Sequence, residues 1–389
     1  MFFFFHNDVL RERFAKKAWS LMQLLSCGGG LSRAAAFDEI CKLLWFQMVL
    51  HTSSARNILS QTSSIKGFYS VAVKDVPCDL FDDTLVVDSS VAEKALIELQ
   101  EINWVSLSVD ERLLFLRCLS YEARRLRIYG VTGNYWIPEV LVKGIMRLVD
   151  VASSRKVLFA TGDSQELFAA LLSCINHNDG ETTCTTCVLS KSLGKFLRRI
   201  AILSGVVSRC TSNDNLISTI EDTSLDSIGF DSAIINTLVL DQPFSIIGDR
   251  EGNIRRRFDL TVRYFERMFA LLRGGSLVVS LIPRSLAGNS RWGATRRVIE
   301  RMFKVCAVLD ISGKWGALRH APFMIVFMRR DKVLEEDEVK CEEIYLDKIN
   351  IENIYSDSLD ATDDKNCIVI FERLASFIKN KISRRCFNG

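Results

Sequence analysis

This sequence of 389 residues has little proline, little histidine and little net charge. It contains five prolines and four histidines, and its net charge is +3. Few prolines and a nearly neutral charge argue against a disordered chain and against one that coats nucleic acid through its overall field. No histidine lies in a nucleophile-elbow context, and neither a Ser-His-Asp nor a Cys-His arrangement stands out. A phosphate-binding loop of the nucleotide-hydrolase type is also missing.

Long apolar runs are absent as well. No stretch approaches the roughly 20 apolar residues of a membrane span, so we expect no membrane partner. Residues 1–5 are a methionine and four phenylalanines, but the run stops at His6 and no positive side chain precedes it, which is unlike a secretory signal. We therefore expect a cytoplasmic protein whose twelve cysteines are mostly reduced and buried.

What the sequence does contain is a composition typical of a globular protein, with 48% hydrophobic and 25% charged residues. Apolar residues recur at three- and four-residue spacing over 34–51, 91–99 and 109–126, which predicts amphipathic helices. The last of these follows Ser108, with Glu111 three residues later, the pattern of a capping box. We expect a helical domain over residues 1–128.

After residue 130, short apolar runs alternate with helical stretches. Strands are predicted at 156–160, 230–236, 276–282, 304–311 and 323–329, with helices at 166–175, 195–205, 259–272 and 294–303 between them. Such alternation indicates an α/β domain with a doubly wound, mostly parallel sheet over residues 129–332. Residues 333–389 form a C-terminal extension, with a weak strand at 343–346 and a final helix at 368–385.

The strand at 230–236 has a pattern that points to function. An acid, Asp231, precedes an apolar run, and the run stops at the amide Asn236. In a parallel α/β sheet, ligands bind at the carboxyl ends of the strands. We therefore expect Asn236 to lie at the ligand-binding edge of the sheet.

The order of motifs from about residue 37 to 330 resembles the adenine-specific DNA methylases, in particular the modification subunit of type I restriction–modification systems. These are class I, S-adenosylmethionine-dependent methyltransferases. The resemblance implies their sheet fold and a cofactor contact in the turn at 133–138, where Tyr135 and Pro138 match the family and Ile137 replaces its threonine.

Two further stretches resemble cofactor-binding turns of that family. The strand–loop–helix at 157–168 matches its glycine-rich turn, and the resemblance implies that Gly162 and Asp163 line the cofactor site. Phe159 stands where the family has an acid. Asp214 matches the acid of a turn that faces the cofactor's adenine.

The strand at 230–236 keeps the register of the family's target-base motif. The resemblance implies that the Asn236 amide accepts a hydrogen bond from the amine of an adenine flipped out of the duplex. The family's Pro-Pro-Phe is absent after Asn236, and Phe244 is a displaced candidate for the aromatic ring that stacks on the base. The basic run Arg255, Arg256 and Arg257, placed in the loop after this motif, could contact DNA phosphates.

The resemblance implies methyl transfer from S-adenosylmethionine to an adenine amine in DNA, together with a separate specificity subunit as partner. The alternative is a member that has lost catalysis and keeps the fold as a DNA- or protein-binding scaffold, because several motif residues are replaced. A third interpretation starts from paired zinc-ligand spacing. The residues with this spacing are Cys174, His177, Cys184 and Cys187.

Overall fold

The computed structural model describes residues 8–51, 64–75, 80–81, 84–124, 137, 139–151, 155–161, 165–177, 182–187, 191–206, 210–213, 229–236, 250–288, 290–313, 323–339, 343–351 and 361–388. The chain divides into two units, Met1–Gly130 with Lys195–Ser208, and Val131–Gly194 with Arg209–Gly389. The three-part division into 1–128, 129–332 and 333–389 stays a prediction. No helix among the described residues is long and apolar enough to cross a membrane.

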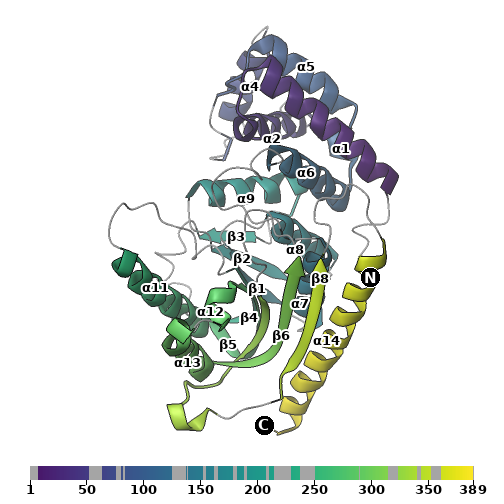
Figure 1. Cartoon of the computed structure of the whole chain (residues 1–389). Helices are drawn as coiled ribbons and strands as arrows, with labels where there is room; N and C mark the ends of the chain where they lie inside the picture. Colours follow the sequence, from purple (N-terminus) through teal and green to yellow (C-terminus); the bar gives the residue numbers. More distant parts are fainter. Residues whose placement is uncertain are drawn as a thin grey trace. The chain divides into compact units, whose positions relative to one another are not determined.

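The first unit is helical in its described parts (Figure 1). Ser108 and Glu111 form the predicted capping box at its last N-terminal helix: the Glu111 amide donates to Ser108 Oγ over 3.3 Å, and the Ser108 amide donates to Glu111 Oε2 over 2.8 Å. The helices are α1 (Asp8–Gln23), α2 (Arg33–Leu50), α4 (Ile65–Asp75), α5 (Ser89–Gln100), α6 (Val109–Arg124) and most of α9 (Lys191–Ser204), with short turns η1 (Leu24–Gly28) and η2 (Trp104–Ser106).

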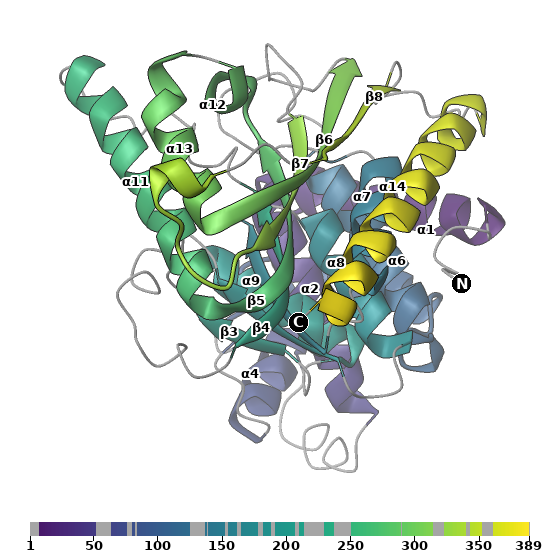
Figure 2. The same ribbon diagram turned by 90° about the horizontal axis from the view of Figure 1, so that it is seen from below.

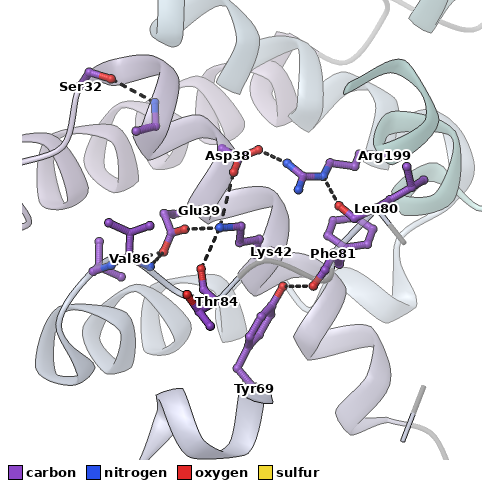
Figure 3. A network of polar contacts seen from close by, with 12 residues as sticks. Ser32, Asp38, Glu39, Lys42, Tyr69, Leu80, Phe81, Thr84, Val86 and Arg199 are labelled. Carbon is purple, nitrogen blue, oxygen red and sulfur yellow. Dashed lines mark hydrogen bonds and ion pairs between the residues drawn. The ribbon is translucent and has the colours of Figure 1, made fainter. Parts of the chain in front are cut away.

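Helix α2 is held by buried charges as well as by apolar packing (Figure 3). Glu39 and Lys42 are both buried, and the Lys42 ammonium donates to Glu39 Oε1 over 2.7 Å and to the Thr84 carbonyl over 3.0 Å. Glu39 Oε2 accepts from the Val86 amide over 2.9 Å. Because every charge has a partner, the desolvation cost is offset, and the segment before α5 is fixed to α2.

Arg199 connects α9 to the same network (Figure 3). Its guanidinium pairs with Asp38, donates from Nε to the Leu80 carbonyl over 2.5 Å, and lies over the Phe81 ring at 5.1 Å. Burial lowers the pKa of Arg199 to about 10. These contacts explain why α9, which lies between two strands of the sheet in sequence, packs with the N-terminal helices.

The second unit contains, in its described residues, an eight-stranded sheet of order β3-β2-β1-β4-β5-β7-β6-β8. Strand β7 is antiparallel to both its neighbours, and every other adjacent pair is parallel. This confirms the predicted doubly wound, mostly parallel α/β fold. The strands are β1 (Lys156–Thr161), β2 (Thr183–Cys187), β3 (Cys210–Asn213), β4 (Phe230–Asn236), β5 (Leu272–Ile282), β6 (Phe303–Gly313), β7 (Phe323–Arg329) and β8 (Tyr345–Ile351).

Helices cover both faces of this sheet (Figure 2). On one face, α11 (Arg250–Leu271) and α13 (Gly293–Met302) bury an apolar cluster that includes Phe265, Met268 and Ile299. On the other face lie α7 (Glu139–Val151), α8 (Gln165–His177) and the long α14 (Ala361–Asn388). Strands between two helical layers are buried on both faces, which is why residues 277–279 of β5 and 323–328 of β7 are hydrophobic runs.

Helices α7 and α14 approach so closely at one point that a β-carbon on α7 would clash with a ring on α14. Gly144 of α7 lies under the buried ring of Phe371 in α14. An Arg147–Glu372 ion pair of 3.0 Å flanks this contact. The close approach explains the use of glycine in the middle of a helix, where it is otherwise unfavourable.

The five strands predicted between residues 156 and 329 are confirmed, the weak strand predicted at 343–346 is displaced to 345–351, and two strands were missed. The bounds of β4 and β7 agree with those predicted at 230–236 and 323–329. No strand was predicted at β2 or β3, which are short and rich in threonine, serine and cysteine. Threonine favours strands because it is β-branched, so the signal was present but weak.

Candidate functional site

The candidate site lies where the strand order reverses, between β1 and β4. From β1 the chain continues outward through β2 and β3, and from β4 it continues outward in the opposite direction through β5. Crevices at such switch points, outside the carboxyl ends of the strands, are where α/β folds bind their ligands. The last residues of the two strands, Thr161 and Asn236, are register partners.

A carboxylate at the opposite end of β4 holds this strand in place. Asp231 Oδ2 accepts hydrogen bonds from the backbone amides of Arg155 and Lys156 over 3.1 and 2.9 Å, at the start of β1. Asp231 Oδ1 pairs with Arg273 of β5 over 2.9 Å. One side chain therefore ties together the amino ends of three adjacent strands.

Asn236 is the last residue of β4, as predicted from the sequence. Its other register partner is Leu281 in β5, one residue before that strand ends. Its backbone therefore reaches the carboxyl edge between two strands that end at the same level. The side chain of Asn236 lies outside the described residues.

Most of the predicted cofactor and base contacts also lie outside the described residues. Two of them follow described strand ends directly in the sequence: Gly162 comes after the last residue of β1, and Asp214 after the last residue of β3. Their assignment to the cofactor site stays a prediction. The residues outside the described parts are Tyr135, Pro138, Gly162, Asp163, Asp214 and Phe244.

The basic run at 255–257 has a different local structure from the one predicted. Arg255, Arg256 and Arg257 were placed in a loop, but α11 begins at Arg250 and includes all three. The loop placement is wrong because arginine is a good helix former and extends the helix toward its N-terminus. Whether these arginines contact DNA stays a prediction.

Comparisons with known proteins agree with this topology. No family model matches the sequence, and no curated protein matches it. A structure from Vibrio vulnificus, assigned as a modification subunit of a type I restriction enzyme, superposes with a TM-score of 0.65 at 10% identity, over 93% of this chain and 90% of that one. The chain has a class I methyltransferase fold.

Two more structures with this methyltransferase fold cover most of the chain. One is a class I S-adenosylmethionine-dependent methyltransferase from Listeria monocytogenes, with a TM-score of 0.60, 12% identity, and coverage of 94% of this chain and 99% of that one. The other is the methyltransferase subunit of a type I restriction–modification system from Streptococcus thermophilus, with a TM-score of 0.58, 11% identity, and coverage of 94% and 93%. At such identities the likeness concerns the fold.

Two positions where the resembled methyltransferases have polar cofactor contacts are described, and both belong to the core. Ile137 is fully buried. Phe159 of β1 is also fully buried, and its ring lies 5.3 Å from that of Phe168 in α8. Phe159 therefore packs the strand against the helix and presents no acid to a ligand.

Tyr264 is a site-supporting residue that the sequence reasoning missed. Its buried hydroxyl donates to the Ala160 carbonyl over 2.7 Å, next to the last residue of β1. This bond attaches α11, the helix that carries the arginine run, to the strand that leads into the predicted cofactor turn. The only signal in the sequence was an apolar stripe in which a tyrosine looks like any other core residue.

The zinc interpretation gains no support from the described residues. Cys174 and His177 lie on α8, whereas Cys184 and Cys187 belong to β2. Alternate residues of a strand share a face, so positions 184 and 187 belong to opposite faces of the sheet. Nowhere in the described part of the chain do three metal-ligating residues gather closely enough to hold an ion.

Proposed function

We propose that the chain is an S-adenosylmethionine-dependent methyltransferase that acts on the exocyclic amine of adenine in DNA. The observation that carries this proposal is the position of Asn236, at the carboxyl end of β4 and in register with the end of β1 at the switch point. S-adenosylmethionine supplies the methyl group when bound. The Asn236 amide oxygen would accept a hydrogen bond from the target amine, which requires the base to leave the duplex.

The backbone of this site suits the cofactor, whereas two of its side chains lack the expected polar groups. The backbone fits, because β1 and β4 end side by side at the switch point, where a nucleotide-like ligand binds. The side chains of Ile137 and Phe159 supply neither of the polar groups that the resembled family has at these positions. Cofactor binding would therefore rest on Tyr135, Gly162 and Asp214.

The second candidate function is a scaffold that binds DNA or protein without catalysis. The packing of Phe159 against Phe168 favours it, because an aromatic core residue there replaces an acid of the cofactor site. We propose DNA as the ligand of the enzyme and DNA or protein as the ligand of the scaffold. For both candidates we propose a separate specificity subunit as a partner and the cytoplasm as the location. The fold's likeness to subunits of type I restriction–modification systems supports the partner.

Calorimetry with S-adenosylmethionine distinguishes the two candidates. We expect micromolar binding to the folded chain and loss of binding in Gly162→Glu, because a side chain there would occupy the turn beside the cofactor. Circular dichroism of the variant controls for folding. A folded wild-type chain that fails to bind, alone and with its specificity subunit, would reject the enzyme and leave the scaffold.

Methyl transfer to DNA then tests the role of Asn236. We expect Asn236→Ala to bind S-adenosylmethionine like the wild type and to lose transfer by about 10²–10³-fold, the usual cost of removing one positioned polar group. Asn350→Ala is the matched control, since Asn350 is also an asparagine near the carboxyl end of a strand, β8. We expect Asn350→Ala to keep the transfer rate of the wild type. If Asn236→Ala also keeps that rate, Asn236 does not belong to the site.

A further inference from the structure

A group of four side chains, here named the edge cluster, lies along the carboxyl edge of the sheet beyond β5. It consists of Arg284, Phe323, Asp310 and Lys348. Register partners run in one row across the sheet: Ile282 with Phe323, Phe323 with Asp310, and Asp310 with Lys348. Arg284 follows β5 by two residues and begins α12 (Arg284–Gly288). In Figure 2, α12 and the arrowheads of β6 and β8 lie at the same edge.

Arg284 is held in one orientation by three contacts. Its Nη2 pairs with Asp310 and donates to the Ile311 carbonyl over 2.9 Å. Its guanidinium lies 4.7 Å from the centre of the Phe323 ring. Even so, 34% of the arginine side chain remains exposed. A planar guanidinium fixed by a carboxylate and an aromatic ring is preorganised to meet a phosphate group.

The edge cluster carries a net positive charge. Lys348 Nζ lies 3.9 Å from Asp310 Oδ2, and its side chain is 73% exposed. The Asp310 carboxylate therefore contacts both Arg284 and Lys348, and its single negative charge neutralises only one of these two positive charges. An anion that approaches this edge meets both cations.

The edge cluster lies a few base-pair lengths from the predicted methyl-transfer site at Asn236, so one DNA duplex could contact both. Phe323 is on β7, two strands from β4, and Lys348 is on β8, four strands from β4. At about 4.8 Å per strand, these steps correspond to roughly 10 and 19 Å. Since duplex DNA rises about 3.4 Å per base pair, these separations equal roughly three and six base pairs.

We infer that Arg284 and Lys348 bind backbone phosphates of a DNA duplex whose target adenine is presented at Asn236. This inference rests on the proposed function. It adds a phosphate contact on the sheet edge to the basic run in α11. It also gives Asp310 a role as a positioning residue that aims the arginine.

The test is the salt dependence of DNA binding by Arg284→Gln and Lys348→Gln. A fluorescent duplex is titrated with the full chain between about 50 and 200 mM salt. The slope of log K against log salt is negative, and each lost phosphate contact makes it less steep by about 0.9, so affinity varies about 3.5-fold less over this range. Lys348 is the safer substitution for folding because its side chain is mostly exposed.

Two residues at the opposite end of the sheet are matched controls. Lys332 also has a 73% exposed side chain and pairs with a carboxylate, Glu338, over 3.3 Å. Arg329 also lies over a phenylalanine ring, that of Phe269, at 3.9 Å. We expect Lys332→Gln and Arg329→Gln to keep the wild-type slope. Equal slopes in all four variants, or a wild-type chain that binds no DNA, would overturn the inference.

Calorimetry with S-adenosylmethionine on the same proteins separates this inference from the proposed function. We expect unchanged cofactor binding in Arg284→Gln and Lys348→Gln. If the wild-type chain binds S-adenosylmethionine and transfers methyl groups, but both variants keep the wild-type salt slope, only the edge cluster is rejected as a DNA site. A chain that binds no cofactor but shows the reduced slopes keeps the edge cluster and loses the proposed methyl transfer.

Discussion

Replacing Gly144 by alanine tests how helix α14 packs on helix α7. A β-carbon at this position would lie 2.2 Å from two ring atoms of Phe371 and 2.4 Å from a third. Carbon atoms pack at about 3.5–4.0 Å, so the ring or the helix must move. Overpacking of this kind costs about 1–3 kcal/mol, and alanine returns about 1 kcal/mol through its better helix propensity. The free energy of unfolding should therefore fall by about 0–2 kcal/mol.

The same substitution should have the opposite sign when the ring is removed. Phe371→Ala alone is expected to cost about 3–5 kcal/mol, because a buried ring is lost. In that background Gly144→Ala meets no ring and stabilises by about 1 kcal/mol through helix propensity. The double-mutant cycle should give a coupling energy of about 1–3 kcal/mol.

Urea unfolding, followed by far-ultraviolet circular dichroism, measures these differences as shifts of the midpoint at constant slope. Gly288→Ala is the control, since a β-carbon there has no neighbour within 4 Å, and its effect should stay within about 0.5 kcal/mol. The reasoning fails if Gly144→Ala changes stability equally in the presence and absence of the Phe371 ring.

Two further predictions concern buried polar and thiol groups. Lys42→Met should lower the free energy of unfolding in urea by about 3–5 kcal/mol, because it leaves the Glu39 carboxylate buried without its cation. Adding Glu39→Gln to the same chain should restore most of this loss. If stability is not restored, the pairing of Lys42 with Glu39 is contradicted. Burial raises the pKa of the Cys41 and Cys306 thiols. Iodoacetamide at mildly alkaline pH should therefore alkylate exposed Cys27 in the folded chain and reach Cys41 and Cys306 only after denaturant is added. Peptide mass spectrometry measures which cysteines are labelled. Labelling of Cys41 before denaturant is added would contradict its burial.

The sequence allowed prediction of elements whose pattern is local. The apolar run that ends at Asn236 specified both ends of β4, and the spacing of Ser108 and Glu111 specified the start of α6. Strands β2 and β3 escaped prediction because polar residues dominate them and neighbouring strands supply their hydrogen bonds. Helix α9 was predicted, but its packing with the N-terminal helices depends on Arg199 meeting Asp38, 161 residues apart.

By itself, the sequence determined the alternation of strands and helices, and with it the fold class and the end of β4 at an amide. Hydrophobic periodicity suffices for this because it depends on residues only a few positions apart. Only the tertiary structure decided which strand ends are neighbours, that Asp231 ties three strands together, and that Arg284 meets Asp310 and Phe323 at one edge. Such contacts join residues distant in the chain, and their geometry comes from strand order and register, which no local pattern encodes.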